Sequence, residues 1–315
     1  MTMTVDETAT RAVNSDFYAV DDFLDDEDRA LVARVRGFVD GEVLPVINDY
    51  WEAADFPYQI LPRLGELGIV GTAIEGYGCP GLTRLQTGLV AMELSRGDGS
   101  VNTLNAVQSG LAMGSIALLG DEEQKQRWLP DMAALRKLGA FALTEPDHGS
   151  DSVALETTAR RDGDHYVIDG AKRWIGLGHV ADVVILWARD TADSRVKAFV
   201  LEKCADGTYP EGYSAEAITG KIAKRAIQQA HIEISGLRVP AENKLALSSS
   251  FRDVSAILNR TRSTVAWEAS GTPSPPTRRL PATCTSGSSS DVRSRATNSC
   301  RTSSRTCSPT SPPCS

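Results

Sequence analysis

The stretch Gly139–Arg189, GAFALTEPDHGSDSVALETTARRDGDHYVIDGAKRWIGLGHVADVVILWAR, decides the fold because turn signals divide it into short apolar strands. A first apolar run ends at the triplet Thr144–Pro146, since proline cannot continue a strand ladder. Two further strands flank Asp162–Asp164, a typical hairpin signal. The pair Asp169-Gly170 predicts a second turn, after which a third strand begins at Lys172. The pattern predicts a β-domain in the middle of the chain.

The chain on either side of this stretch shows a different periodicity. Ahead of it, apolar residues recur at helical spacing, with a kink predicted at Pro45 and a loop at 76–81. The predicted helices are 21–49, 57–67, 82–96, 100–119 and 125–138. Behind it, strands are predicted at 197–201, 215–221 and 230–234, followed by a helix at 254–269. In the loop before the last strand, we interpret Lys224 and Arg225 as solvated charges, or alternatively as contacts to a phosphate.

Composition excludes several classes of protein. The chain has 315 residues, 41% of them hydrophobic, and a net charge of −8. Residues 270–315 carry six Arg and one Asp, which leaves −13 on residues 1–269 and argues against nonspecific nucleic-acid binding. The absence of an apolar run of 18 residues argues against a membrane span, and the acidic N-terminal region lacks a signal pattern, so we expect a cytoplasmic protein. The Cys and His spacings predict no metal site.

A set of motifs with matched spacing carries a family resemblance. These motifs are Thr144-Glu145-Pro146, Gly149-Ser150-Asp151, Gly170-x-Lys172-x-Trp174-Ile175 and Ala181-Asp182 before an apolar strand. The sequence resembles the acyl-CoA dehydrogenase and oxidase flavoprotein family, and within it the branch of glutaryl-CoA dehydrogenases and short-chain acyl-CoA oxidases. The resemblance implies an α+β fold in four parts. These are an N-terminal α-helical domain (20–138), a middle β-barrel-like domain that binds FAD and substrate (139–242), the first helix of a C-terminal helical domain (243–269) and a disordered tail (270–315).

The resemblance also implies a flavin site. FAD needs an apolar wall for its ring, donors for its pyrimidine edge and close backbone approach at its pyrophosphate. The positions that match the family's flavin contacts are Phe141, Leu143, Thr144, Gly149, Ser150, Trp174, Ile175 and Gly176. Trp174 taken without its motif would be read as a core residue. Relatives carry Thr or Ser where this chain has Gly176, so we hypothesise that reduced flavin is more exposed to oxygen here.

Further positions concern the substrate. The resemblance implies contacts to the acyl-CoA from Ser150, Leu258, Asn259 and Arg262, although a helix Arg taken alone would be read as merely exposed. In glutaryl-specific relatives, a Glu and an Arg recognise the distal carboxylate. Ser95 and Asn102 match those two positions, so we predict that glutaryl-CoA is not the substrate.

The last 46 residues, 270–315, change in character. They contain 13 Ser, one Leu, one Val and no Ile, Met, Phe, Tyr or Trp, a composition that cannot bury a core. The segment 287–299 can be back-translated so that a shifted frame reads QQFGRPIARYQL, which resembles the family's flavin-contacting helix of the C-terminal domain. We therefore infer a frameshift near Ala269. In most relatives the catalytic base lies beyond that point, and in a minority it lies at the position of Thr261, which is no base.

These observations lead to a functional expectation. By resemblance, the protein is an oxidoreductase that uses FAD for the α,β-desaturation of an acyl-CoA, and we predict that this chain is truncated and inactive, with no catalytic base. Two alternatives are a noncatalytic flavin and acyl-CoA binding module, and an oxidase that uses oxygen. The implied partners are acyl-CoA and either an electron-transfer flavoprotein or oxygen. The family forms dimers or tetramers, although the lost helices argue against that assembly here.

Overall fold

Helix α1 (Asp26–Phe38) begins with three acidic residues, which favour the positive end of its dipole. The computed structural model describes residues 20–272, and Asp26–Thr272 form one compact unit. A short 3-10 helix, Val20–Phe23, precedes α1. The helical half continues with η3 (Val39–Val43), α2 (Ile47–Ala53), η4 (Tyr58–Ile60), α3 (Leu61–Glu66), α4 (Arg84–Gly97), α5 (Gly99–Asn105), η5 (Ala106–Met113), α6 (Gly114–Leu119) and α7 (Glu122–Ala133).

Two of the predicted helices differ from the structure in an informative way. The predicted helix 21–49 is divided into α1, a π-helical turn (η3) and α2, with the break at Pro45. The predicted helix 100–119 is continuous, but its middle part, η5, is π-helical. The predicted loop at 76–81 contains a small hairpin, β1 (Glu75–Gly76) with β2 (Cys79–Pro80). The break in the first helix lies at Pro45 because proline has no amide hydrogen to donate to the helix.

A partly buried cluster of charges joins α1 to α4. Glu93 on α4 is buried, and it accepts hydrogen bonds from Arg36 Nη2 at 2.5 Å and from Arg96 Nε at 2.8 Å. Arg96 also donates to Asp40 at 2.7 Å. Burial favours the neutral form of Glu93, but the two guanidinium groups outweigh it and hold the pKa of this carboxyl below its ordinary value of 4.5.

Replacing Glu93 by Gln should therefore destabilise the protein in a manner that depends on pH. At pH 7 we expect the free energy of unfolding to fall by about 1.5–3 kcal/mol, the range for hydrogen bonds to charged groups. Because the pKa is lowered in the fold, this stabilisation is present above pH 4.5 and is lost as the pH falls through the folded value. Urea unfolding of the original protein and of Glu93→Gln between about pH 3 and 7 measures the difference between their free energies of unfolding. The exposed pair Arg63–Glu66 is the control, and Glu66→Gln should change little at any pH. A gap for Glu93→Gln that stays constant with pH would contradict the assignment.

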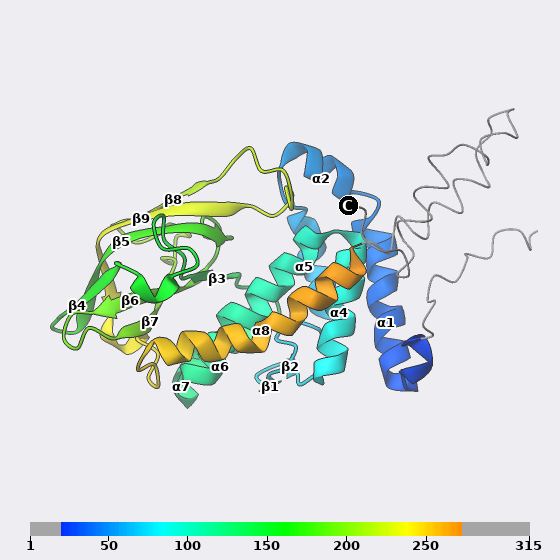
Figure 1. Cartoon of the computed structure of the whole chain (residues 1–315), viewed down its shortest axis with the longest axis horizontal. Coiled ribbons are helices and arrows are strands. Elements are labelled where there is room, and N and C mark those ends of the chain that lie inside the picture. Colours follow the sequence, from blue (N-terminus) through cyan, green and yellow to red (C-terminus); the bar gives the residue numbers. More distant parts are fainter. Residues whose placement is uncertain (1–19, 273–315) are drawn as a thin grey trace, which may run out of the picture. The chain divides into compact units, whose positions relative to one another are not determined.

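The strands after β2 form one curled sheet of seven (Figure 1). They are β3 (Gly139–Ala142), β4 (Thr158–Asp162), β5 (His165–Gly176), β6 (Val183–Asp190), β7 (Val196–Glu202), β8 (Tyr213–Ala217) and β9 (Gln229–Pro240). The order is β3-β6-β4-β5-β9-β8, and β7 pairs with β6. Strand β6 is parallel to both β3 and β4, whereas the other pairs are antiparallel. The structure thus has the α+β class and the helix-then-sheet order predicted from the sequence.

One predicted turn is wrong. Asp169-Gly170 does not end a strand, because β5 runs without interruption from His165 to Gly176. The register with β9 shifts between Ile168 and Gly170, which is a β-bulge, and Gly170 has φ +149°. A Gly inside a strand can mark a bulge as well as a turn, so the pair of residues alone did not distinguish the two.

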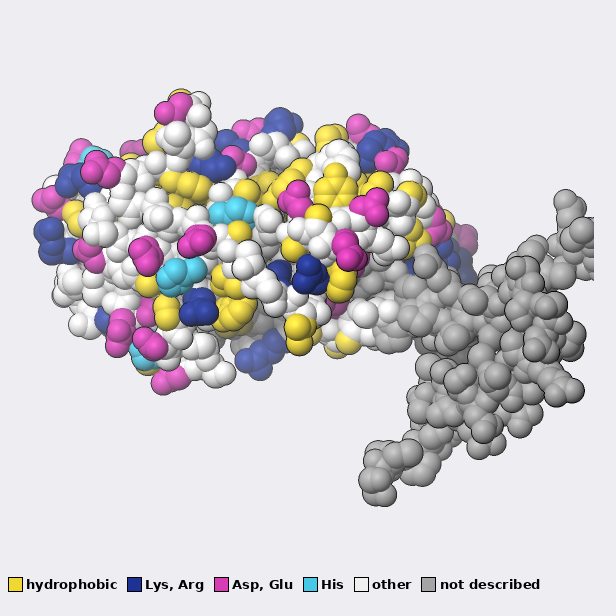
Figure 2. Space-filling view, turned by 90° about the horizontal axis from the view of Figure 1, so that it is seen from above, with side chains coloured by type: hydrophobic (Ala, Val, Ile, Leu, Met, Phe, Trp, Pro, Cys, Tyr) yellow, Lys and Arg dark blue, Asp and Glu magenta, His cyan; other side chains and the backbone are white. Residues whose placement is uncertain are grey.

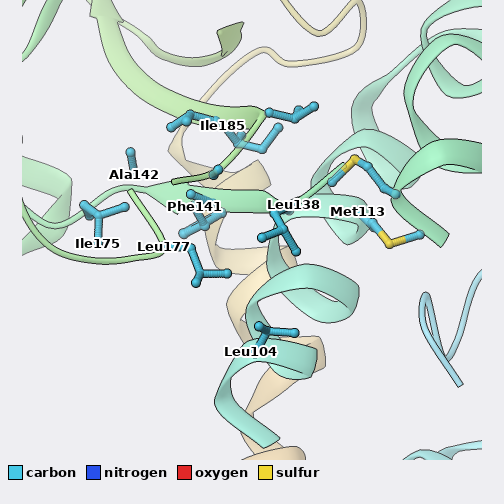
Figure 3. Close-up of a cluster of buried hydrophobic side chains, with 14 of the residues drawn as sticks. Leu104, Met113, Leu138, Phe141, Ala142, Ile175, Leu177 and Ile185 are labelled. Carbon is cyan, nitrogen blue, oxygen red and sulfur yellow. The ribbon is translucent and has the colours of Figure 1, made fainter. Parts of the chain in front are cut away.

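Helical residues cover one side of the first strand. Figure 3 shows Leu104 and Met113 from the helical half facing Leu138 and Phe141, with Ile175, Leu177 and Ile185 beyond them. Phe141 packs edge-on against Trp187, their ring centroids 5.8 Å apart. Buried Gln108 of η5 fixes the start of β3, because its Nε2 donates to Met132 O at 2.9 Å and its Oε1 accepts from the Gly139 amide at 2.6 Å. The two halves therefore share one core.

The final helix, α8 (Phe251–Gly271), lies along α4 and η5 (Figure 1). It begins with a capping box between Ser250 and Asp253. Trp267 packs so closely over Gly88 of α4 that a side chain at Gly88 would meet the indole ring. The helix extends two residues beyond the predicted end at 269, and the predicted disordered tail otherwise lies outside the described residues. Within residues 20–272, no helix has the length and apolarity needed to cross a membrane.

Candidate functional site

A cavity of about 360 Å³ opens where β3, β5, η5 and α8 meet. Its wall contains all eight residues predicted as flavin contacts, namely Phe141, Leu143, Thr144, Gly149, Ser150, Trp174, Ile175 and Gly176. The remaining wall is made of Val107, Leu111, Ser152 and Leu258. The lining combines apolar side chains with three hydroxyls, those of Thr144, Ser150 and Ser152, and within the described residues no hydrogen bond occupies any of the three.

Local backbone geometry brings Trp174 to the cavity. A second register shift between Lys172 and Ile175 interrupts the pairing of β5 with β9, and Trp174 has φ +64°, which is unusual for a residue with a side chain. Trp174 is 52% exposed, with the Arg173 guanidinium 5.5 Å from the centroid of its ring. The Arg173 amide donates to Thr144 O at 2.8 Å. Strained backbone is common at ligand sites, so this conformation favours a binding role for Trp174 over the core role.

A fully buried ion pair lies directly behind this wall. Lys172 Nζ is 2.8 Å from Glu145 Oε1 and donates to Leu143 O at 3.1 Å. Glu145 also accepts from the hydroxyl and amide of Thr157 and from the Glu156 amide. The pair joins the turn after β3 to the bulged end of β5, which are the two segments that carry most of the cavity wall.

The environment shifts the pKa of both groups. Burial lowers the pKa of Lys172 to about 8, against the partial opposition of Glu145. Burial alone would raise the pKa of Glu145, but the ammonium group of Lys172 and the hydrogen bonds from Thr157 and Glu156 hold it below its ordinary value. Sequence reasoning recorded both residues as parts of motifs and missed their contact, which their spacing of 27 residues does not reveal.

A second cavity of about 220 Å³ adjoins the first, and the two share Val107 and Leu111. Its wall includes Asn102 of α5 and Thr261 of α8. Asn102 is 1% exposed, whereas Ser95, the other position compared with glutaryl-specific relatives, is buried elsewhere and donates to Ala91 O at 2.7 Å. The structure thus brings only one of these two residues to a cavity.

Lys224 and Arg225, interpreted as solvated charges, are partly exposed, but both also have protein partners. Lys224 lines the smaller cavity, where its Nζ pairs with Glu268 and donates to Thr103 Oγ1 at 2.7 Å. Arg225 donates to the backbone carbonyls of Trp51 and Glu52, with its guanidinium 5.0 Å from the Trp51 ring centroid. Loop composition alone could not show that helices α2 and α8 lie beside this loop.

The predicted substrate contacts on α8 differ in their position. Leu258 lines the larger cavity, while Asn259 and Arg262 are exposed and line neither cavity. Figure 2 shows that Lys and Arg side chains are interspersed with Asp and Glu over the face that it presents. Of the four predicted substrate contacts, Ser150 and Leu258 line the larger cavity. Asn259 and Arg262 lie at the surface.

Comparison with known proteins identifies the relatives of this fold. The acyl-CoA dehydrogenase N-terminal domain matches residues 25–136, and the acyl-CoA dehydrogenase middle domain matches residues 140–237. A short-chain-specific acyl-CoA dehydrogenase of Clostridium acetobutylicum is 33% identical over 215 residues, which are 67% of this chain and 55% of that protein. The chain spans about half the length of the curated relatives it matches.

Solved structures agree with this result. A glutaryl-CoA dehydrogenase from Mycobacterium smegmatis aligns with a TM-score of 0.80 and 33% identity, covering 90% of this chain and 72% of the other. A structure of a glutaryl-CoA dehydrogenase from the same organism in complex with FADH2 aligns with a TM-score of 0.78 and 34% identity, covering 85% of this chain and 66% of the other. Fold, motifs and matched domains together show that this chain belongs to the acyl-CoA dehydrogenase family, whose members are oxidoreductases.

Proposed function

We propose that this chain binds FAD in the larger cavity and an acyl-CoA thioester beside it, as a member of a family that desaturates such thioesters at the α,β position. The observation that carries the proposal is that all eight motif residues line one cavity. A side chain at Gly149 would meet no protein atom within 4 Å, so the backbone there can approach a ligand. When bound, FAD supplies a hydride acceptor.

The residues that line the cavity would contact different parts of the ligand. Phe141, Leu143 and Ile175 offer an apolar wall for a ring system, and the unoccupied hydroxyl of Thr144 offers a hydrogen bond to its polar edge. The exposed face of Trp174 adds an aromatic surface at the cavity wall. The acyl chain would lie against Val107 and Leu111, which line both cavities.

The described residues do not provide a base for this reaction. A base must come within hydrogen-bond reach of the substrate's α-proton. No Asp, Glu or His lines the larger cavity within residues 20–272, and the smaller one has Glu268, which Lys224 and Asn102 already engage. We therefore propose that this part of the chain binds both ligands without turnover. The electron acceptor, an electron-transfer flavoprotein or oxygen, stays a prediction.

Spectroscopy on the purified chain tests this proposal. After incubation with FAD and gel filtration, we expect flavin absorbance to coelute with the protein, and butyryl-CoA to shift the flavin spectrum without bleaching it. Loss of the flavin on the column would contradict the proposed binding. Bleaching by butyryl-CoA would contradict the absence of a base.

Gly149→Val provides the matched variant. A Cβ at this exposed position meets no protein atom within 4 Å, so the free energy of unfolding of the FAD-free chain should change by no more than about 0.5 kcal/mol. The same side chain would crowd a ligand at the cavity, and overpacking of about 1–3 kcal/mol should weaken FAD binding by a factor of about 5–150. Unchanged FAD affinity would argue that the ligand lies elsewhere.

A further inference from the structure

Helix α8 is anchored unevenly along its length. Its first half buries Val254 and Ile257 in the core, whereas its second half, from residue 258 onward, buries only Gly271 among the described residues. Val265, in the second half, is 66% exposed. Because most of the stability of a helix in a protein comes from burying apolar side chains, the second half is held less firmly than the first.

This weakly buried half of α8 covers the smaller cavity. Four of its residues line the cavity, namely Thr261, Thr264, Val265 and Glu268. The rest of the wall comes mainly from α4, α5 and η5, which belong to the helical half of the chain. If the end of α8 moved away from these helices, the cavity would be open along one side.

An ion pair joins this half of α8 to the sheet. Lys224, in the loop between β8 and β9, pairs with Glu268 and also donates to Thr103 Oγ1 at 2.7 Å. Glu268 in turn accepts from Asn102 Nδ2 at 2.8 Å. The side chain of Lys224 is 40% exposed and that of Glu268 is 16% exposed, so water and salt reach the pair.

The loop that carries Lys224 is itself held in place. Lys221 Nζ donates to Lys224 O at 2.7 Å and to Ile227 O, and both Ala226 and Ile227 are fully buried. Arg225 donates to two backbone carbonyls in the last turn of α2, each at 3.1 Å, where the negative end of the helix dipole favours a cation. The backbone of Lys224 is therefore fixed, and its side chain reaches out to α8.

We propose that the second half of α8, residues 258–271, is a lid on the smaller cavity, and that Lys224 and Glu268 form the latch that holds it closed. When the ion pair separates, the lid lifts and the cavity opens to ligands. A partly exposed ion pair shifts an equilibrium by no more than about fivefold, so the lid opens often, and high salt favours opening. The inference goes beyond the proposed function and does not depend on what the cavity binds.

Amide hydrogen exchange of the full chain, followed by peptide mass spectrometry, tests the lid. Exchange at residues 262–271 reports its opening, and exchange in the first half of α8 reports the anchored part. Raising the salt concentration from about 0.01 M to about 1 M should accelerate exchange in the lid about fivefold and leave the anchored part unchanged. Equal lid exchange at both salt concentrations would overturn the proposal. Equal acceleration in both halves would also overturn it, because α8 would then open as a whole.

Charge variants separate the latch from packing. Glu268→Gln keeps the size of the side chain and removes its charge, so lid exchange should rise about fivefold and no longer respond to salt. Lys224→Glu should raise lid exchange further, because two carboxylates would then face each other. Adding Glu268→Lys to Lys224→Glu restores the pair with reversed polarity, and lid exchange should return to within about twofold of the original protein.

An exposed ion pair on the sheet provides the control. Asp162→Asn removes the partner of Arg238, which lies 2.9 Å away, and should leave lid exchange unchanged. If the reversed pair exchanged as fast as Lys224→Glu alone, the attraction between positions 224 and 268 would not hold the lid, and the proposed latch would be wrong.

Discussion

Replacing Lys172 by Met should lower the free energy of unfolding by about 3–5 kcal/mol, the largest effect that we expect from a side chain beside the candidate flavin site. The substitution keeps an unbranched side chain as far as Cε, removes the ammonium group and leaves the buried Glu145 without its counter-charge. Removing one member of a buried pair is costly because the remaining charge has lost both water and its partner. Urea unfolding followed by tryptophan fluorescence measures the loss.

The dependence on pH gives the assignment a second readout. Because the pKa of Glu145 is lowered in the fold, its contribution is present above its ordinary pKa and disappears as the pH falls. Because burial lowers the pKa of Lys172 to about 8, its own contribution is lost as the pH falls through that value and is fully present only above its ordinary value of 10.5. The deficit of Lys172→Met should therefore grow as the pH rises.

A double variant is the matched control for this loss. Adding Glu145→Gln to Lys172→Met removes the stranded charge while keeping a side chain that can bond to Thr157. We expect the double variant to recover at least about half of the lost stability, since removing both members of a buried pair is often nearly neutral. A double variant as unstable as the single one would show that the Lys172 side chain acts through packing.

Replacing Gly170 by Ala should cost about 2–6 kcal/mol in total. The φ of +149° at this bulge accounts for about 1–3 kcal/mol. Close packing accounts for about 1–3 kcal/mol more, because the new methyl group would lie 2.5 Å from Thr157 Oγ1 and 2.8 Å from Thr157 Cα. The same contact would displace the hydroxyl that donates to Glu145, so the thermal midpoint should fall and FAD binding should weaken with it.

Gly163→Ala separates these two contributions. Gly163 has φ +63° in the turn between β4 and β5, but a side chain there would meet no atom within 4 Å. This variant should lose only the backbone contribution, about 1 kcal/mol, and should keep its FAD affinity. Equal losses of stability in Gly163→Ala and Gly170→Ala would show that the close approach of the new methyl group to Thr157 costs no stability.

Sequence reasoning was most successful where local signals were strong. Turn residues located the β-hairpin around Gly163, and helical spacing located α4 and α8 to within two to three residues. The motif residues were chosen for their resemblance to a flavin site, and the fold brings all eight to one cavity. Their contact with FAD stays a prediction.

Features that depend on distant segments could not be predicted. The continuity of β5 through Gly170 depends on pairing with β9, which lies more than 50 residues later. The ion pair of Lys224 with Glu268 joins a loop to a helix more than 40 residues away. In each case the deciding partner is separated from the residue in sequence, so composition and periodicity near the residue hold no information about it.

The π-helical segment Ala106–Met113 has a consequence for how this protein could change. Its wide turns accommodate more residues per turn than an α-helix, and they set the angular phase of the residues that follow. Deleting one residue there would restore the ordinary period and leave the helix on either side in phase, because a wide turn holds about one residue more than an α-helical turn. The residues inside the segment would change direction, and Gln108, which bonds to the start of β3, is one of them. A single codon lost from this segment would thus re-sort which side chains meet a ligand and which meet the interior.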